Sequence, residues 1–148
     1  MRLAAAWAIY TERRLLVILL LVFPTGLPLA LTGSTLAGWM RDEGVDLKTI
    51  GLFALVGLPY VLKFIWAPFV DHVRIPFLTR LLGRRRSWLL LTQAAVAASL
   101  VMMGLVDPKA APVLMAGAAL LVAFCSATQD IVIDAFRVES LRTDEQAA

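Results

Sequence analysis

Three charged residues fall on one face of an otherwise apolar segment near the end of the chain. Asp130, Asp134 and Arg137 are spaced at i, i+4 and i+7, so a helix places them on a common side. The residues that precede them on that side are all small: Ala116, Ala119, Ala123, Ser126 and Ala127. This pattern predicts a close-packed helix seam that ends in a charged cluster, facing another helix or a cavity.

One further charge, Lys63, interrupts another apolar segment. A charge inside a membrane span is costly, and such residues usually pair with one another and mark ion or proton pathways. We therefore predict that Lys63 pairs with Asp130 or Asp134, and that these residues and Arg137 form a proton-coupling network. The alternative is a set of interfacial salt bridges whose long side chains only reach toward water.

Enzymatic signatures are absent from the sequence. It contains no zinc-protease helix motif, no phosphate-binding glycine loop and no Ser/His/Asp set, and His72 is expected in a solvated loop. Asp130 and Asp134 resemble acid pairs that hold Mg²⁺ for diphosphate chemistry, but Mg²⁺ sites need further oxygen ligands and no second acid cluster exists. We predict no catalytic residues, no metal site and no cofactor.

The composition indicates an all-α membrane protein. Hydrophobic residues make up 60% of the 148 residues, above the roughly 45–50% of a soluble domain. The mean hydropathy is +0.81. The net charge is +3, and most charged residues cluster in short gaps between apolar runs, which excludes a nucleic-acid-binding face and makes the lipid bilayer the expected partner.

The charged gaps divide the chain into four predicted transmembrane helices. The expected order is an interfacial lead-in (1–14), a first span (15–40), a turn (41–48), a second span (49–70), a basic loop (71–86), a third span (87–106), a turn (107–111), a fourth span (112–136) and a tail (137–148). Ten Lys and Arg residues lie on the side of the basic loop and the termini, and three lie in the two turns. The excess of positive charge predicts cytoplasmic termini and turns on the outer side.

The first span is interrupted in its middle by Pro24 and Pro28. Each proline frees a backbone carbonyl, and a broken helix at this depth is tolerated only where protein or a wet cavity meets the freed groups. We predict a cavity lining formed by Thr25, Pro28, Thr32, Thr35 and Gln129. The alternative is that the Thr and Gly residues only mediate close helix packing.

The basic loop carries a second candidate motif at its two ends. Its residues are Asp71, Gly83, Arg84, Arg85 and Arg86. An acid that closes one span and Gly-Arg-Arg that opens the next resemble the cytoplasmic signature of the major facilitator superfamily, which locks two helix bundles together. Here the acid and the glycine are further apart, and His72 stands where arginine is usual. The alternative is a loop that serves only positive-inside anchoring.

Four long segments, 25–40, 46–71, 82–93 and 123–136, are similar to the amino-terminal third of AmpG-type muropeptide permeases, a branch of that superfamily. The resemblance implies part of the amino-terminal bundle of a multi-pass transporter in the bacterial inner membrane, which makes the two turns periplasmic. It implies proton-driven import of anhydro-muropeptides, GlcNAc-anhydro-MurNAc with or without peptide, for peptidoglycan recycling. It also implies a link to β-lactamase induction.

The same resemblance implies a longer protein, because such transporters have two bundles with the substrate site between them. We expect the chain to be an amino-terminal fragment or a truncated reading frame whose carboxy-terminal bundle is missing. Other substrates, such as acetyl-CoA or a drug, and a transport-inactive fragment are the alternatives. A complete four-span exporter acting as a homodimer is disfavoured, because the first span has no acid.

Overall fold

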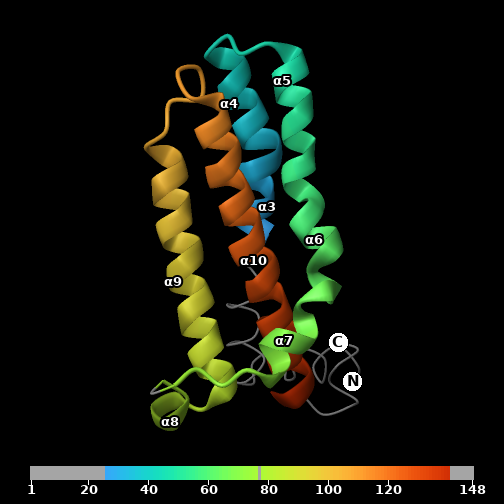
Figure 1. The fold of residues 1–148 in the computed structure, drawn as a ribbon, viewed down its shortest axis with the longest axis vertical. Coiled ribbons are helices and arrows are strands. Elements are labelled where there is room, and N and C mark those ends of the chain that lie inside the picture. Colours follow the sequence, from blue (N-terminus) through green and yellow to red (C-terminus); the bar gives the residue numbers. More distant parts are fainter. Residues whose placement is uncertain (1–25, 77, 141–148) are drawn as a thin grey trace, which may run out of the picture.

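The fold was obtained as a computed structural model, which describes residues 26–76 and 78–140 (Figure 1). All regular secondary structure in these ranges is helical. The predictions for 1–14, for the first part of span 15–40 including Thr25, and for the end of the tail lie outside the described residues. The all-α prediction is therefore confirmed for the part of the chain that can be compared.

The described part of the first predicted span is one helical rod of three pieces. α3 (Gly26–Ala30), a π-helical segment η2 (Leu31–Thr35) and α4 (Leu36–Asp42) follow one another without a break. The π turn lies inside this rod, and such turns are frequent at functional sites.

The second predicted span is a succession of short helices. It comprises α5 (Leu47–Leu52), the 3₁₀ segment η3 (Phe53–Gly57), α6 (Leu58–Leu62), the 3₁₀ segment η4 (Lys63–Ile65) and α7 (Ala67–His72). Pro59 and Pro68 stand in the first turns of α6 and α7. Because proline has no N–H to donate, each one starts a new helical piece where a continuous helix would otherwise continue.

The basic loop is shorter than the predicted range 71–86. It contains α8 (Leu78–Leu82), and α9 (Arg84–Gly104) begins inside it. Gly83 adopts a φ of +81°, a left-handed conformation that favours glycine, and this residue turns the chain from α8 into α9. The arginines that follow are good helix formers, so α9 starts at Arg84, before the predicted position.

The last helix, α10 (Pro112–Ser140), starts at the predicted proline and continues four residues past the predicted end at 136. It runs through the middle of the bundle and packs against α9, the first rod and the second rod (Figure 1). Within the described residues, three segments are long and apolar enough to cross a membrane: Leu47–Ile65, Arg84–Gly104 and Pro112–Glu139.

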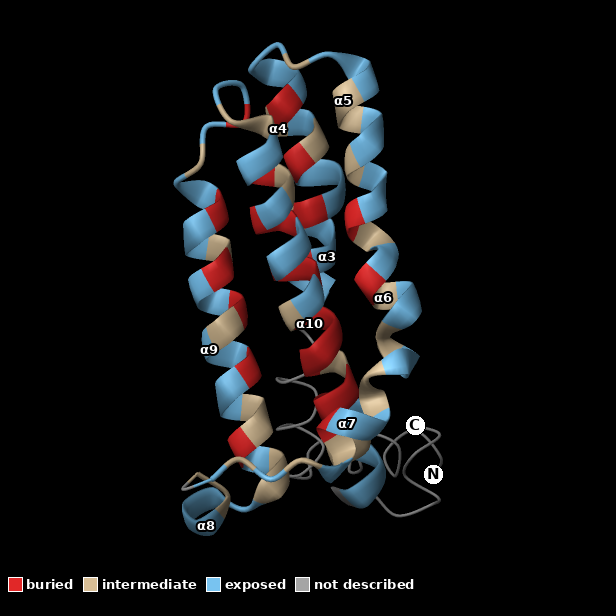
Figure 2. Ribbon diagram, viewed as in Figure 1, coloured by how far each residue is buried: buried red, intermediate tan, exposed pale blue. Residues whose placement is uncertain are grey.

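The core lies along α10, which carries a large share of the buried residues (Figure 2). Ala119, Ala123 and Ala127 have no exposed surface, which confirms the predicted seam of small residues. Small side chains let helix backbones approach closely, which is a main source of packing energy in membranes. The outer faces of the bundle carry exposed large apolar side chains such as Val61, Phe64 and Ile65, as expected of surfaces that face lipid.

Candidate functional site

Lys63, Asp130 and Asp134 form a group that we call the intramembrane cluster. Lys63 Nζ lies 3.9 Å from Asp130 Oδ2 and 3.7 Å from Asp134 Oδ2, so the predicted pairing is present with both acids. Both separations exceed a good hydrogen-bond distance. The lysine therefore lies between two carboxylates, held by charge and not by a fixed hydrogen bond.

The local fold explains how the lysine reaches the acids. Lys63 is the first residue of the 3₁₀ segment η4. Like the other pieces of the second rod that contact α10, η4 packs against that helix. Asp130 and Asp134 are one helical turn apart on α10, so one side chain can face both. Asp130 is the more enclosed acid, with 23% of its side chain exposed against 67% for Asp134.

Arg137 was assigned to the same network, and the structure places it apart. Its side chain is exposed, and it makes no ion pair with any residue in the described ranges. The described network thus consists of one base and two acids.

Asp71, Arg85 and Glu139 form a second group, the boundary cluster, at the end of the bundle that carries the basic loop. Arg85 Nη1 donates to Asp71 Oδ1 at 2.6 Å. Arg85 Nη2 and Nε donate to Glu139 Oε1 at 2.6 and 3.0 Å. The Arg85 side chain is only 14% exposed, and its guanidinium bridges acids from two different helices. Charge-assisted hydrogen bonds of this kind are short and strong.

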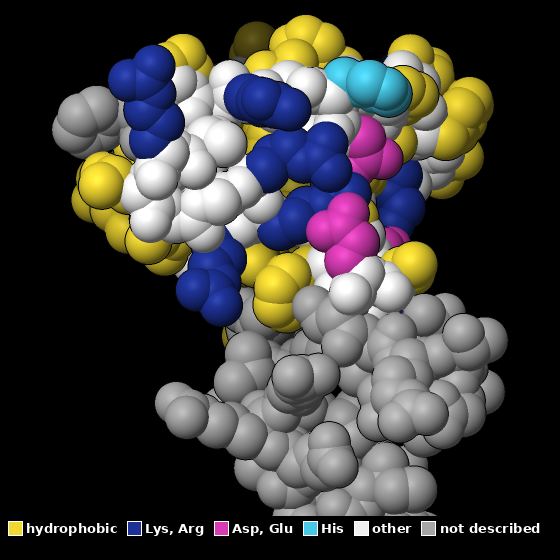
Figure 3. Space-filling model, turned by 90° about the horizontal axis from the view of Figure 1, so that it is seen from below, with side chains coloured by type: hydrophobic (Ala, Val, Ile, Leu, Met, Phe, Trp, Pro, Cys, Tyr) yellow, Lys and Arg dark blue, Asp and Glu magenta, His cyan; other side chains and the backbone are white. Residues whose placement is uncertain are grey.

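The remaining residues of the loop motif surround this arginine. Arg84 donates to the backbone carbonyl of Asp71 and lies 3.7 Å from Glu139 Oε1, while Arg86 is exposed. Viewed from the basic-loop end, basic side chains lie next to the acidic ones (Figure 3). Trp88 Nε1 donates to Val73 O at 2.9 Å and ties the start of the loop to α9.

Glu139 is the residue of this cluster that the sequence analysis missed. It lies nine positions after Asp130, which is about 180° around an ideal helix, so the stripe of acids does not include it. The available signal was its charge, because an acid at the end of α10 is complementary to the arginines of the basic loop. Its partner, Arg85, is brought to it by the side-by-side packing of α9 and α10.

The predicted cavity-lining residues do not share one environment. Pro28 and Thr32 are buried, and Thr32 Oγ1 donates to Pro28 O at 2.7 Å, while Thr35 is exposed. Gln129 is buried and its Nε2 donates to Gln93 Oε1 on α9 at 2.6 Å. Gln93 is a second residue that the sequence analysis left without a role.

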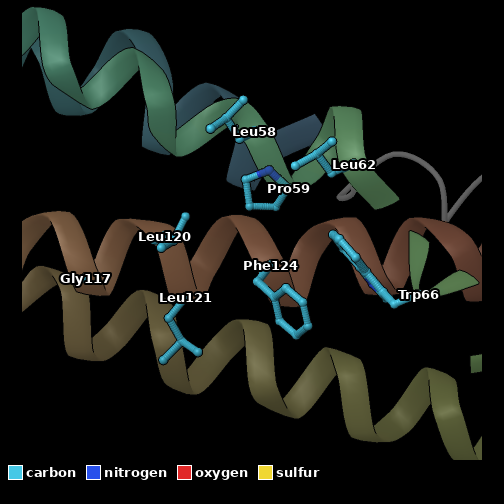
Figure 4. Close-up of a pocket in the computed structure, with 8 residues that line it drawn as sticks. All are labelled: Leu58, Pro59, Leu62, Trp66, Gly117, Leu120, Leu121 and Phe124. Carbon is cyan, nitrogen blue, oxygen red and sulfur yellow. The ribbon is translucent and has the colours of Figure 1, made fainter. Parts of the chain in front are cut away.

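One groove along α10, of about 480 Å³, joins the two clusters: Lys63 and Asp134 line one part, and Asp71, Arg85 and Glu139 line another. Another groove, of about 490 Å³, is lined by apolar residues of α6 and α10 and by Trp66 (Figure 4). Within the described ranges, no group of three or more His, Cys, Asp or Glu side chains is placed to hold a metal ion.

Comparison with known proteins assigns a family to this arrangement. Residues 13–117, more than two thirds of the chain, match the family model described as Acetyl-coenzyme A transporter 1. The chain belongs to that family. The Escherichia coli K12 protein named Anhydromuropeptide permease is 46% identical over 140 residues, covering 95% of the chain and 28% of that protein.

Further relatives carry related names. A Rickettsia conorii protein named as an AmpG 4 transporter is 37% identical over 139 residues, which is 94% of the chain and 33% of that protein. A Haemophilus influenzae Rd protein named only as uncharacterized is 43% identical over 133 residues, 90% of the chain and 30% of the protein. The resemblance to AmpG-type permeases is confirmed, and the chain is a membrane protein that spans about a third of these relatives' length.

Proposed function

We propose that the chain forms the amino-terminal part of a bacterial inner-membrane transporter for anhydro-muropeptides. The observation that carries the proposal is the 46% identity over 140 residues to the protein named Anhydromuropeptide permease. The substrate would be GlcNAc-anhydro-MurNAc, with or without peptide, imported from the periplasm for peptidoglycan recycling. Through that substrate the transporter would be linked to β-lactamase induction. A carboxy-terminal bundle would complete the substrate cavity.

In this proposal the intramembrane cluster couples uptake to the proton gradient. Asp130 is the proton carrier, because it is the less exposed of the two acids and its charge is neutralised only by a loosely held lysine. Protonation would remove the attraction of Lys63 for Asp130 and leave the lysine paired with Asp134 alone. The change of partner would move the lysine's charge along α10, so the two protonation states would differ in their contacts. A difference of this kind is needed for protonation to change the conformation.

The boundary cluster would have a different task. With both termini and the basic loop on the cytoplasmic side, Arg85 would hold the ends of α7, α9 and α10 together. Such a fastened end gives a rigid surface for a second bundle to close against. Thr25, Pro28, Thr32, Thr35 and Gln129 keep their proposed place in the cavity lining.

A second candidate substrate is acetyl-CoA, because the matching family model is described as Acetyl-coenzyme A transporter 1. Both candidates are large polar molecules with acidic groups, so the present residues do not separate them. Competition between the two for uptake would separate them, and inhibition of muropeptide uptake by acetyl-CoA at similar concentration would favour the second candidate. A chain that is inactive by itself is the remaining alternative.

A chimera tests the proposal. The segment of the Escherichia coli permease that aligns with this chain is replaced by residues 1–148 and expressed in cells that lack their own permease. We expect uptake of radiolabelled anhydro-muropeptide to be restored, with no competition from acetyl-CoA. A chimera that reaches the membrane at the level of the parent permease but takes up no muropeptide would contradict the proposal. If the chimera does not accumulate, the chain and the rest of the permease are expressed as two polypeptides and the same uptake is measured.

A further inference from the structure

A group of hydroxyls from three parts of the bundle meets inside the helix seam. Tyr60 on α6, Ser126 on α10 and Thr32 on the π-helical segment η2 lie near enough for their side chains to interact. Ser126 is 1% exposed and Thr32 is 5% exposed. We call these three residues the hydroxyl cluster. They lie where α10 contacts both other rods.

Two of these hydroxyls are buried without a hydrogen bond to any described residue. Neither Tyr60 Oη nor Ser126 Oγ meets a partner in hydrogen-bonding geometry. Thr32 uses its proton on Pro28 O, so its oxygen is left to accept. Leaving buried hydroxyls unpaired is costly, and proteins commonly satisfy such groups with a buried water that makes about three hydrogen bonds.

The cluster lies one helical turn from the acid of the intramembrane cluster. Ser126 precedes Asp130 by four residues on α10, which is about 6 Å along the axis at 1.5 Å per residue. It lies on the side of Asp130 that faces away from the basic loop. An apolar core that includes Leu36, Met40 and Met115 separates it from the far end of the bundle.

We propose that Thr32, Tyr60 and Ser126 bind a water molecule and that this hydrated site relays protons to Asp130. The proposal rests on the proposed proton-coupled function. In the relay, one O–H bond of the water breaks as a proton bonds to the Asp130 carboxylate. The hydroxide left behind takes a proton from the Tyr60 or Ser126 hydroxyl, and that hydroxyl is reprotonated by the proton that enters from the aqueous side under the gradient, so no net charge remains on the cluster. The charged groups that face Asp130 are Lys63 from η4 and Asp134 from its own helix.

The first test concerns the water and needs no transport assay. Tyr60→Phe, Ser126→Ala and the double variant of the chain are melted in detergent. If a water bridges the two hydroxyls, each single variant lowers the melting temperature by about 2–5 °C, and the double variant lowers it little further. Unchanged or raised melting temperatures in both single variants would overturn the water site, because removing a dry, unpaired hydroxyl relieves strain.

The matched control is Ser99→Ala. Ser99 is a buried serine on α9, and its Oγ donates within its own helix, to Val96 O at 3.0 Å. We expect the changes in melting temperature caused by Ser99→Ala and Tyr60→Phe to add in the double variant. Non-additivity with Ser99 as well would mean that the coupling is not specific to the hydroxyl cluster, which would also overturn the site.

The second test concerns the relay and uses the chimera. We expect Tyr60→Phe and Ser126→Ala each to lower gradient-driven muropeptide uptake roughly tenfold, and Ser99→Ala to have less than about a twofold effect. Normal uptake by both cluster variants would overturn the relay while leaving the proposed function intact. Loss of uptake by the unmodified chimera would overturn the relay together with the proposed function, and the melting experiment would still decide whether water is bound.

Discussion

The two charged clusters on α10 use similar residue types and differ in how tightly they are held. In the boundary cluster, one arginine makes three hydrogen bonds of 2.6–3.0 Å to acids from two helices. In the intramembrane cluster, one lysine lies 3.7 and 3.9 Å from two acids of the same helix. Only about one helical turn of α10 separates Asp134 from Glu139.

This difference indicates different tasks. A planar guanidinium with several fixed donors holds its partners in one geometry, whereas an ammonium group on a flexible chain can move between partners. We therefore interpret the boundary cluster as a fastener and the intramembrane cluster as the part that changes during transport. The first three predictions below test this comparison.

The largest expected effect is on transport. Asp130→Asn in the chimera should lower muropeptide uptake about 100-fold, because it removes the proposed proton carrier, and should leave the amount of folded protein unchanged. Asp134→Asn is the matched variant one turn away, and its loss should be about tenfold smaller because Asp134 is nearer water. A greater loss with Asp134→Asn would reverse the assignment of the two acids.

The next effect is on stability. Arg85→Lys keeps the charge and removes the fork that joins Asp71 to Glu139, so the free energy of unfolding in detergent should fall by about 1–2 kcal/mol. Arg86→Lys, the exposed neighbour, should change it by less than about 0.5 kcal/mol. Equal effects of the two substitutions would mean that the boundary cluster is not a fastener.

A charge swap tests the looser pair. Lys63→Asp and Asp130→Lys should each lower the level of folded protein, and the double variant should recover part of the loss, with a coupling of about 0.5–1 kcal/mol. The parallel swap of Lys63 with Asp134 shows which acid the lysine prefers. No recovery in either swap would remove the pairing.

The smallest effect concerns the start of α5, away from both clusters. Asp46 accepts hydrogen bonds from the hydroxyl and the backbone N–H of Thr49, and these lower the pKa of its carboxyl below the ordinary 3.8. A lowered pKa in the folded state stabilises the protein above pH 3.8, and this contribution is lost as the pH falls through the folded pKa. Asp46→Ala should therefore melt lower than the parent at neutral pH, and the difference in melting temperature should shrink as the pH falls through the lowered pKa of Asp46. A gap that does not depend on pH would exclude the carboxylate as the cause.

The sequence predicted the elements with strong local signals. The apolar runs located α9 and α10, and the cost of a buried charge led from Lys63 to its two acids. The division of the second rod into short helices was harder to predict. A proline such as Pro59 or Pro68 can either stand in the first turn of a new helix or kink a continuous helix. Its succession of short helices depends on how the rod packs against α10.

The residues that were missed depend on contacts between helices that are distant in sequence. Glu139 joins the boundary cluster across 54 residues, and Gln93 meets Gln129 across 36. The spacing of residues along one helix does not indicate which residues of a distant helix they contact. The hydroxyls of Tyr60 and Ser126 were overlooked for the same reason, since each residue is unremarkable within its own segment.

The most direct test of the account measures protons and substrate together. The chimera is placed in proteoliposomes with a pH-sensitive dye inside, and anhydro-muropeptide is added outside. We predict acidification of the interior with the unmodified chimera, acidification in proportion to folded protein with Arg85→Lys, and none with Asp130→Asn. Substrate-driven acidification that persists in Asp130→Asn would contradict the proposed division between a coupling cluster and a fastening cluster.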